Sequence, residues 1–432
     1  MNSSIRIKLI VMMFLEYLIW GAWFPLLNNY IGPKYLNFDW LQGALVNDAF
    51  AIMSLTAIFF GGQLADRYFS QEKFLAFSLF VSGLALLGLS AVGAQAPVPA
   101  VEGAAVVEAA PALASTFWSF FALMMLYSFF YVPTLSVTNS IAFANLKDAQ
   151  NEFGVIRVGG TLGWIAAAWP FLFFLPITSL FTFAGVAALV TAAYCLVLPS
   201  TPPVKRQGSG FAPLEAFKLL SVPTILVLFI VTFIDSLVHN CYFITSGPFY
   251  EKLGLPEKWI SAAMSIGQIA EIATMAALGF FLKRLGWRTT MIIGVLGHVV
   301  RFAIYALGGY YGGQLWLGLI VASNVVHGFA YAFFFATVYI FVDENFPKDV
   351  RTSAQSLFNL LILGLGPFVG GFLWKGLEAA FTNDVGGKQT IDYNLLFLVP
   401  LALGLVSAAI LAIFFHPKAK EPDPEEVPVL VN

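Results

Sequence analysis

Two polar residues interrupt the apolar stretch MSIGQIAEIATMAALGFF, residues 264 to 281. Gln268 and Glu271 lie three apart, so a helix presents them on one face. An amide and a carboxyl can bind hydroxyl groups, and a carboxyl can also carry a proton. Two interpretations are open. Either this face lines a watery, substrate-sized cavity, or the pair forms a structural hydrogen bond to a neighbouring helix.

A second polar stripe is predicted near residue 157. Arg157, Thr161 and Trp164 are spaced four and three apart, which places them along one side of a helix. The Trp164 ring offers a stacking surface. Alternatively, Arg157 extends to the inner membrane surface, because charged residues precede it closely.

Further polar residues lie in other apolar runs. In FIDSLVHNCYF the spacing of Asp235 and His239 permits a hydrogen bond between them. Arg301 is interpreted as structural, with a carboxylate partner. The remaining candidates either line the same cavity or make packing hydrogen bonds; they are Asn47, Asp48, Asn139, Asn324 and Asn359.

The composition of the whole chain is typical of a membrane protein. Of 432 residues, 59% are hydrophobic and only 11% charged, against about 25% in soluble domains, and mean hydropathy is +0.82. The net charge of −2 gives no reason to expect a nucleic-acid partner. The two cysteines lie in apolar runs and indicate neither a metal site nor a disulfide framework.

A helix that crosses about 30 Å of hydrocarbon needs roughly 20 apolar residues. Twelve such runs are expected, and the first is too long for a signal-peptide core. They begin near residues 8, 42, 74, 115, 155, 178, 222, 258, 288, 314, 352 and 392.

An even number of spans puts both termini on one side. With the termini cytoplasmic, 16 of the 22 Lys and Arg residues fall inside, as the positive-inside rule requires. The exceptions are Lys34, Lys252, Lys258, Lys375 and Lys388 outside, and Arg301 within a span.

The connectors divide the chain. Residues 95–113 are predicted to form a flexible outer loop, and the polar stretch 200–221 a cytoplasmic linker. This predicts an N-terminal six-helix bundle at 1–199 and a C-terminal one at 222–416. Residues 417–432 are charged and Pro-rich, typical of a disordered cytoplasmic tail.

A weak internal repeat supports two bundles. GQLADRYFSQEKF follows the second span and GFFLKRLGWRTTM the eighth, roughly half the chain apart. Gly-x-Leu-Ala-Asp-Arg in the first copy is similar to the inner-loop signature of the major facilitator superfamily. By that resemblance Gly62, Asp66 and Arg67 belong to a gating motif that stabilises one conformation and does not touch substrate.

Several motifs in register resemble the bacterial nucleoside permeases, which are nucleoside:proton symporters. They are WGAW at 20–23, YVPTLSVTNSIAF at 131–143, IRVGGTLGW at 156–164, SIGQIAE at 265–271 and RTSAQ at 351–355. Together they cover nearly the whole chain. The resemblance implies the major facilitator fold: an all-α membrane protein with two six-helix bundles and a central ligand site.

The resemblance also assigns the site. The matching Gln and Glu of the permeases contact nucleoside, and the resemblance places the matching Arg and Thr in the substrate cavity. Trp164 and Tyr331 stand where the family has Phe, and His327 where it has Tyr. The implied substrate-binding residues are Arg157, Thr161, Trp164, Asn240, Gln268, Glu271, His327 and Tyr331.

One departure bears on proton coupling. Ala332 stands where the nucleoside permease has an Asp important for transport, and Glu16 stands where the family has Gln. With one carboxyl lost and one gained, we expect Glu16 or Glu271 to take up the proton. The alternative for Glu16 is a salt bridge or a shared hydrogen bond within the bundle.

The sequence therefore predicts a monomeric secondary transporter of the bacterial inner membrane that imports nucleosides with protons. Alternatives are a proton-coupled monosaccharide transporter and a transporter-fold receptor that has lost coupling. No HExxH, GxSxG or Walker motif is present, and the four histidines show no ligand pattern, so neither an enzyme nor a cofactor is expected.

Overall fold

The computed structural model describes residues 3–68, 70–95, 109–146, 149–202, 219–345 and 357–417. Within these ranges the side chains of 57–68, 109–114, 149–151, 219, 343, 345, 385 and 388 are not described. In the described part every regular element is a helix except one hairpin. This follows from the composition, because a helix satisfies its own backbone hydrogen bonds in lipid.

The first half of the chain forms the elements up to α8. They are α1 (Ser3–Trp23), η1 (Phe24–Leu26), α2 (Leu27–Tyr30), α3 (Trp40–Tyr68), α4 (Gln71–Ala94), α5 (Ala109–Asn145), α6 (Ala149–Ala166), α7 (Trp169–Phe173), η2 (Ile177–Ser179) and α8 (Leu180–Cys195).

The second half begins after the central connector. Its helices are η3 (Leu219–Ser221), α10 (Pro223–Lys252), η4 (Glu257–Trp259), α11 (Ile260–Tyr311), α12 (Gly313–Ala322), α13 (Val325–Ala330), η5 (Tyr331–Ala336), α14 (Thr337–Asn345), η6 (Leu360–Leu365), α16 (Gly366–Ala380) and α17 (Tyr393–Phe414). The turns η5 and η6 are π-helical. Strands β1 (Thr382–Val385) and β2 (Lys388–Ile391) pair antiparallel, with Thr382 opposite Ile391.

Ten helical stretches in the described residues are long and apolar enough to cross a membrane. One of them, Glu257–Tyr311, has 55 residues and contains a break at Gly286, whose φ of 73° suits glycine. α3 is not among the ten, although its 29 residues measure about 43 Å. The number twelve therefore stays a prediction.

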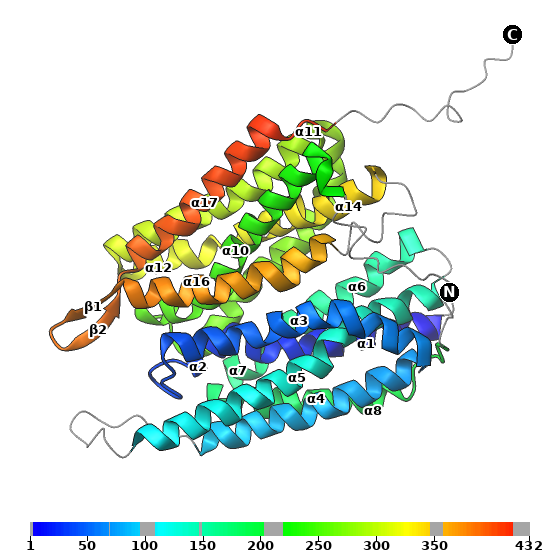
Figure 1. Cartoon of the computed structure of the whole chain (residues 1–432), viewed down its shortest axis with the longest axis horizontal. Coiled ribbons are helices and arrows are strands. Elements are labelled where there is room, and N and C mark those ends of the chain that lie inside the picture. Colours follow the sequence, from blue (N-terminus) through cyan, green and yellow to red (C-terminus); the bar gives the residue numbers. More distant parts are fainter. Residues whose placement is uncertain are drawn as a thin grey trace, which may run out of the picture.

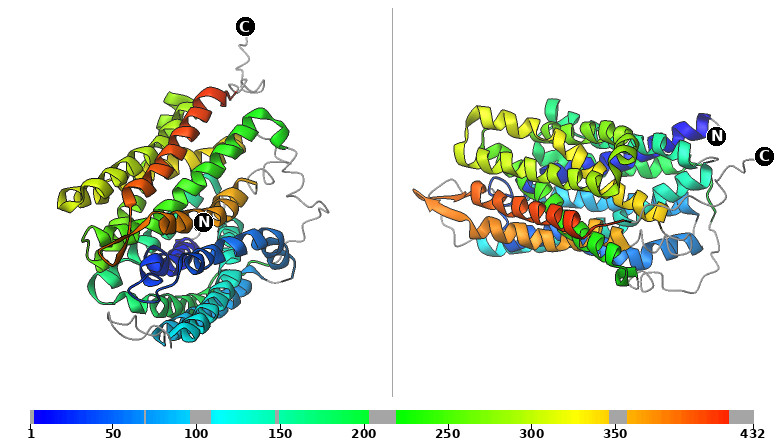
Figure 2. Two further views of the ribbon diagram at one scale, coloured as in Figure 1. Left: turned by 60° about the vertical axis from the view of Figure 1, so that its left-hand side comes forward. Right: turned by 90° about the horizontal axis from the view of Figure 1, so that it is seen from above.

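The two halves of the chain lie side by side. Figure 1 shows α1, α3, α4, α5 and α8 together below, and α10, α11, α12, α16 and α17 above. α16 and α3 pack against each other at the boundary. The views in Figure 2 show the long helices running along one common direction. α1 begins and α17 ends at one end of the molecule, the terminal side, and the hairpin lies at the other, the hairpin side.

Some predicted boundaries differ from the structure. α5 begins at Ala109, within the expected outer loop, and stays helical through Pro133. Gly62, Asp66 and Arg67 lie on the backbone of α3, but their side chains are outside the described residues. Most of the linker and tail (203–218 and 418–432) and the RTSAQ motif are also outside the described residues.

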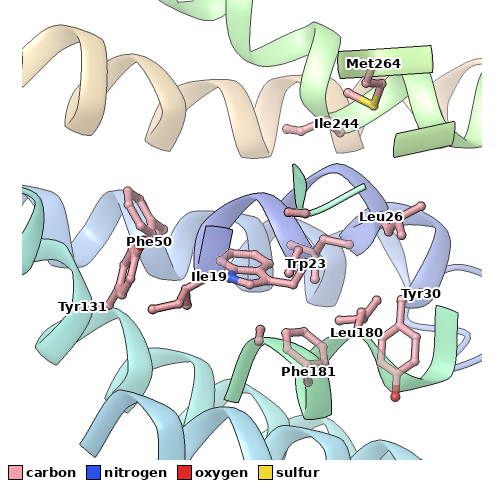
Figure 3. Packing of buried hydrophobic residues seen from close by; sticks show 14 of the residues in the cluster. Ile19, Trp23, Leu26, Tyr30, Phe50, Tyr131, Leu180, Phe181, Ile244 and Met264 are labelled. Carbon is pink, nitrogen blue, oxygen red and sulfur yellow. The ribbon is translucent and has the colours of Figure 1, made fainter. Parts of the chain in front are cut away.

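Aromatic residues fill the core of the first half (Figure 3). Trp23 is 1% exposed, and its indole N–H donates to the Tyr127 hydroxyl at 3.1 Å. Its ring stacks near Phe181, with centroids 6.1 Å apart. The hydrogen bond satisfies the polar atom of a large buried side chain, so the ring is fixed in one orientation.

α1 and α6 approach closely because glycines line their contact. A Cβ at Gly163 would overlap the backbone of Phe14, and one at Gly159 would meet the carbonyl oxygen of Ile10. Small residues at such crossings let helix backbones pack in lipid. This contact positions Arg157 and Trp164, which lie on the same helix.

We expect Gly163→Ala to lower the melting temperature in detergent, because an added methyl group must push α6 away from α1, at a cost of about 1–3 kcal/mol. Gly154→Ala on the same helix is the matched control, since nothing lies within 4 Å of its Cβ position. Equal melting temperatures for the two variants would contradict the close contact.

Candidate functional site

Arg157 turns toward α1. Its guanidinium carbon lies 4.2 Å from the centre of the Tyr17 ring, a cation–π distance. Both residues are partly buried. The arginine therefore does not simply extend to the terminal surface, since an aromatic ring of a neighbouring helix holds its charged end.

Glu271 and Tyr331 face this pair from the second half of the chain. Arg157 is attracted electrostatically to Glu271, and both charges act on the Tyr331 hydroxyl. Gly328 allows this arrangement, because a Cβ there would overlap the backbone of Glu271. Tyr17, Arg157, Glu271 and Tyr331, here the central cluster, thus bring residues of α1, α6, α11 and η5 together across the two halves.

Two predicted amides have unused hydrogen-bonding capacity. Gln268 is 7% exposed, and its side-chain oxygen has no hydrogen-bond partner among the described residues. The Asn240 side-chain oxygen is likewise buried and unpartnered within the described part of the chain. Leaving a buried polar atom unpaired costs about 1–3 kcal/mol. Both oxygens are therefore suited to accept a hydrogen bond from a ligand. Thr161 is partly exposed on α6, one turn after Arg157.

Aromatic rings from both halves meet beside these polar groups. Trp164 packs edge-on against Trp20 at 5.2 Å and reaches Phe243 of α10 at 6.4 Å. Phe243 in turn contacts the ring of His327 at 5.8 Å. Trp164 is partly exposed and His327 is buried. A planar ligand at this place would find ring faces from both halves of the chain.

The Glu16 carboxyl points into the first half of the chain. It is fully buried, and one oxygen accepts a hydrogen bond from the Thr134 hydroxyl. Its other oxygen has no hydrogen-bond partner among the described residues. The hydrogen bond considered as an alternative from the sequence is therefore present.

The surroundings of Ala332 are apolar among the described residues. This residue is fully buried in an apolar cluster with Leu278, Phe333 and Ala336. An ionised carboxylate would be costly among these side chains.

A further buried polar group lies between α10 and α11. Asp235 lies 3.8 Å from His298 Nε2, so its nearest basic partner is His298 and not His239, as the spacing had suggested. Arg301 is fully buried over the Tyr242 ring, 4.3 Å from its centre, and is attracted to Asp235. The structural role expected for Arg301 is consistent with these contacts.

Polar contacts also join the halves on the hairpin side. The Asn29 amide donates to Glu251 at 2.8 Å, the Lys34 ammonium to Glu257 at 3.1 Å and the Tyr35 hydroxyl to Glu257 at 2.7 Å. We call these five residues the hairpin-side bridge. They connect the segment after α1 with α10 and η4, and so hold the halves together at this end.

Lys34 of the hairpin-side bridge stays charged at neutral pH. Burial opposes the charge on Lys34, but hydrogen bonding and attraction to Glu257 and Glu251 outweigh it, so the pKa of Lys34 lies above its ordinary value. Burial and the bond to Glu257 raise the pKa of the Tyr35 hydroxyl as well. A raised lysine pKa keeps the ion pair intact below the ordinary value and weakens it only as the pH rises through the raised one.

Several of these positions were not identified from the sequence. Tyr17, Phe243 and the hairpin-side bridge lie in ordinary-looking apolar or loop segments, and only the spatial contact reveals them. The described residues contain no group of three or more His, Cys, Asp or Glu side chains able to hold a metal ion.

Two packed halves of long apolar helices, with a polar and aromatic site between them, define a membrane transporter of the major facilitator type. The chain belongs to the nucleoside H+ symporter family, whose model matches residues 1–420. This confirms the family predicted from the motifs. The relatives are transporters, not enzymes.

Individual relatives cover almost the whole chain. It is 31% identical to the putative nucleoside transporter YegT of Escherichia coli K12, over 98% of this chain and 96% of that protein. It is 28% identical to the xanthosine permease of the same organism, over 98% of each. The crystal structure of the nucleoside transporter NupG has a TM-score of 0.79 at 24% identity and covers 97% of this chain and 100% of that one, which shows the shared fold.

Because Arg157 and Glu271 attract each other, the effects of substituting them on the free energy of unfolding should not simply add. In a double-mutant cycle, we expect the destabilisation of the double variant to differ by about 0.5–3 kcal/mol from the sum for Arg157→Gln and Glu271→Gln. The reason is that each single change leaves one charge uncompensated. Thermal melting in detergent measures the effect. Pairing Arg157→Gln with Glu378→Gln, which alters a carboxylate bound to Lys375 instead, should give additive values. Additivity in both cycles would exclude the coupling.

Proposed function

We propose that this chain imports nucleosides together with protons across the bacterial inner membrane, by alternating access between two six-helix bundles formed by twelve spans. The bundles are the N-terminal (1–199) and C-terminal (222–416) parts, with both termini cytoplasmic and the hairpin side outside. The observation that carries the proposal is the central cluster, which draws Tyr17 and Arg157 from one half and Glu271 and Tyr331 from the other.

The proposed substrate site consists of hydrogen-bonding and stacking groups. Gln268 and Asn240 supply free amide oxygens to ribose hydroxyls or to base N–H groups. Trp164, His327 and Tyr331 supply ring faces for the base. Arg157, Thr161 and Glu271 complete the site with a charged donor, a hydroxyl and a carboxylate. A sugar alone would leave the ring faces unused, which favours a nucleoside.

The hairpin-side bridge supports alternating access. With Asn29, Lys34 and Tyr35 bound to α10 and η4, the hairpin side is held shut. The Lys34–Glu257 pair is exposed, and the bonds from Asn29 and Tyr35 are partly buried. An exposed ion pair contributes only about 0.2–1 kcal/mol. Such a bridge closes one side and still allows it to reopen. The inner-loop motif Gly62, Asp66 and Arg67 is proposed to stabilise the other end.

Binding can be tested with a thermal-shift screen of nucleosides, nucleobases and monosaccharides on the purified protein. We expect a nucleoside to raise the melting temperature, and Gln268→Ala to weaken its binding about ten- to a hundredfold, because a hydrogen bond is lost from a buried site. Gln314→Ala is the control, since this amide is exposed on α12. Stabilisation by monosaccharides alone would indicate the sugar-transporter alternative.

Proton coupling is proposed to depend on Glu16 or Glu271. Uptake into vesicles should be concentrative under an imposed pH gradient, and it should lose this dependence in Glu16→Gln or Glu271→Gln, because an amide cannot take up the proton. Nucleoside exchange without a gradient serves as the control for folding. The hypothesis fails if uptake stays fully gradient-dependent in both variants, and binding without any uptake would indicate a receptor.

A further inference from the structure

Asp48 occupies an unusual place on α3. It lies about 12 Å along the helix from Trp40, the hairpin-side end, and it is fully buried. Neither carboxyl oxygen has a hydrogen-bond partner among the described residues. Asp48 is also no part of the proposed substrate site or of the proton carriers named above.

The contact that buries Asp48 comes from the other half of the chain. A Cβ at Gly371 of α16 would overlap the Asp48 carboxyl, so only glycine leaves room for it. The preceding residue, Gly370, faces the Asn240 side chain of α10 in the same manner. Two consecutive glycines therefore let α16 pack closely against both Asp48 and a residue of the proposed substrate site.

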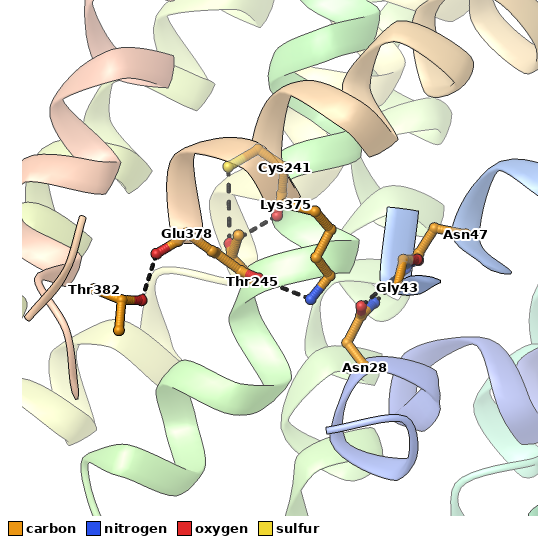
Figure 4. A network of polar contacts seen from close by, with 8 residues as sticks. All are labelled: Asn28, Gly43, Asn47, Cys241, Thr245, Lys375, Glu378 and Thr382. Carbon is orange, nitrogen blue, oxygen red and sulfur yellow. Dashed lines mark hydrogen bonds and ion pairs between the residues drawn. The ribbon is translucent and has the colours of Figure 1, made fainter. Parts of the chain in front are cut away.

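The elements around Asp48 offer it no counter-charge. Lys375 and Glu378 of α16 lie nearer the hairpin and bind each other at 2.8 Å, beside Gly43 (Figure 4). α5 contributes the neutral Tyr127 and Tyr131, and η6 carries no titratable group. The charged pair of α4, Glu72 and Lys73, lies at its terminal-side start.

The protonation state of Asp48 must then follow the packing of the halves. A buried carboxylate without a cation or a hydrogen-bond donor costs several kcal/mol. With α3 and α16 in contact, Asp48 is therefore a neutral acid. If the halves separate on the hairpin side, water reaches the carboxyl and it ionises.

We propose that Asp48 is a proton-operated latch: α3 and α16 close on the hairpin side only after Asp48 has bound a proton from that side. The proton moves from hairpin-side water to the carboxylate and returns to the same side on reopening. The latch thus senses external acidity and does not itself transport the proton. It rests on the proposed function only in requiring that the two halves move apart.

The burial of Glu16 differs in this respect. Its hydrogen-bond partner Thr134 belongs to the same half of the chain, so separating the halves leaves that contact in place. Of the two carboxyls, Asp48 is the one whose surroundings include a helix of the other half.

The test measures closing directly and needs no ligand. Spin labels at Leu41 on α3 and Asn383 on β1, both exposed, report the distance between the halves on the hairpin side. The buried Cys195 and Cys241 are first replaced by alanine. The ratio of open to closed molecules is then measured in lipid nanodiscs as a function of pH.

One linked proton makes this ratio rise up to tenfold per pH unit. We expect this dependence in the otherwise native chain and in Glu344→Gln, which alters an exposed carboxyl of α14. We expect its loss in Asp48→Asn, which should stay closed at every pH. An Asp48→Asn variant that opens with the same pH dependence as the native chain would overturn the proposal.

A second pair of variants avoids reliance on the folding of Asp48→Asn. Gly371→Ala places a methyl group against the carboxyl and should shift the population toward open at each pH, whereas Gly376→Ala, with nothing within 4 Å, should not. Equal populations for the two variants would also contradict the latch. Absence of nucleoside binding would refute the proposed cargo but would leave this result unaffected.

Discussion

The structure depends on the cost of placing a polar side chain in hydrocarbon. Ionisable groups at membrane depth must face protein or water, and this chain directs several of them to the boundary between its two halves. Arg157 meets an aromatic ring of α1, Glu271 meets Arg157, and Asp48 meets a glycine of α16. The arrangement of the polar residues thus defines where the two halves must meet.

Glycines make close helix contacts possible both within the halves and between them. Gly163 brings α6 onto α1, Gly328 brings α13 onto α11, and Gly371 brings α16 onto α3. In lipid there is little hydrophobic gain from helix association, so close packing and a few polar contacts carry it. Contacts of this kind are sensitive to shape, and a small displacement of one helix changes which side chains are shielded from water.

The sequence was sufficient for the class of fold and for the family. Long helices could be predicted because apolar runs of sufficient length have one structural solution in a membrane, and Gln268 and Glu271 lie on one helix as expected. The partners were not predictable from spacing. Asp235 is near His298, more than sixty residues along the chain, although His239 lies at the right helical distance. Pairings between helices depend on rotation and depth, which periodicity within one helix does not specify.

Local irregularities were equally hidden. The π-helical turns η5 and η6 look like ordinary apolar sequence, yet η5 begins at Tyr331 of the central cluster. An extra residue in a helical turn changes which side chains face a neighbour. Counting by 3.6 residues through this region therefore gives the wrong face beyond Tyr331.

α11 consists of two helical segments that are joined at Gly286. The first segment carries Gln268 and Glu271, and the second carries His298 and Arg301, with a single non-helical residue between them. Because no loop separates the two segments, a tilt of the first segment must either change the backbone angles at Gly286 or move the second segment as well. Movement of the segment that carries Gln268 and Glu271 is therefore passed on to the segment that carries His298 and Arg301.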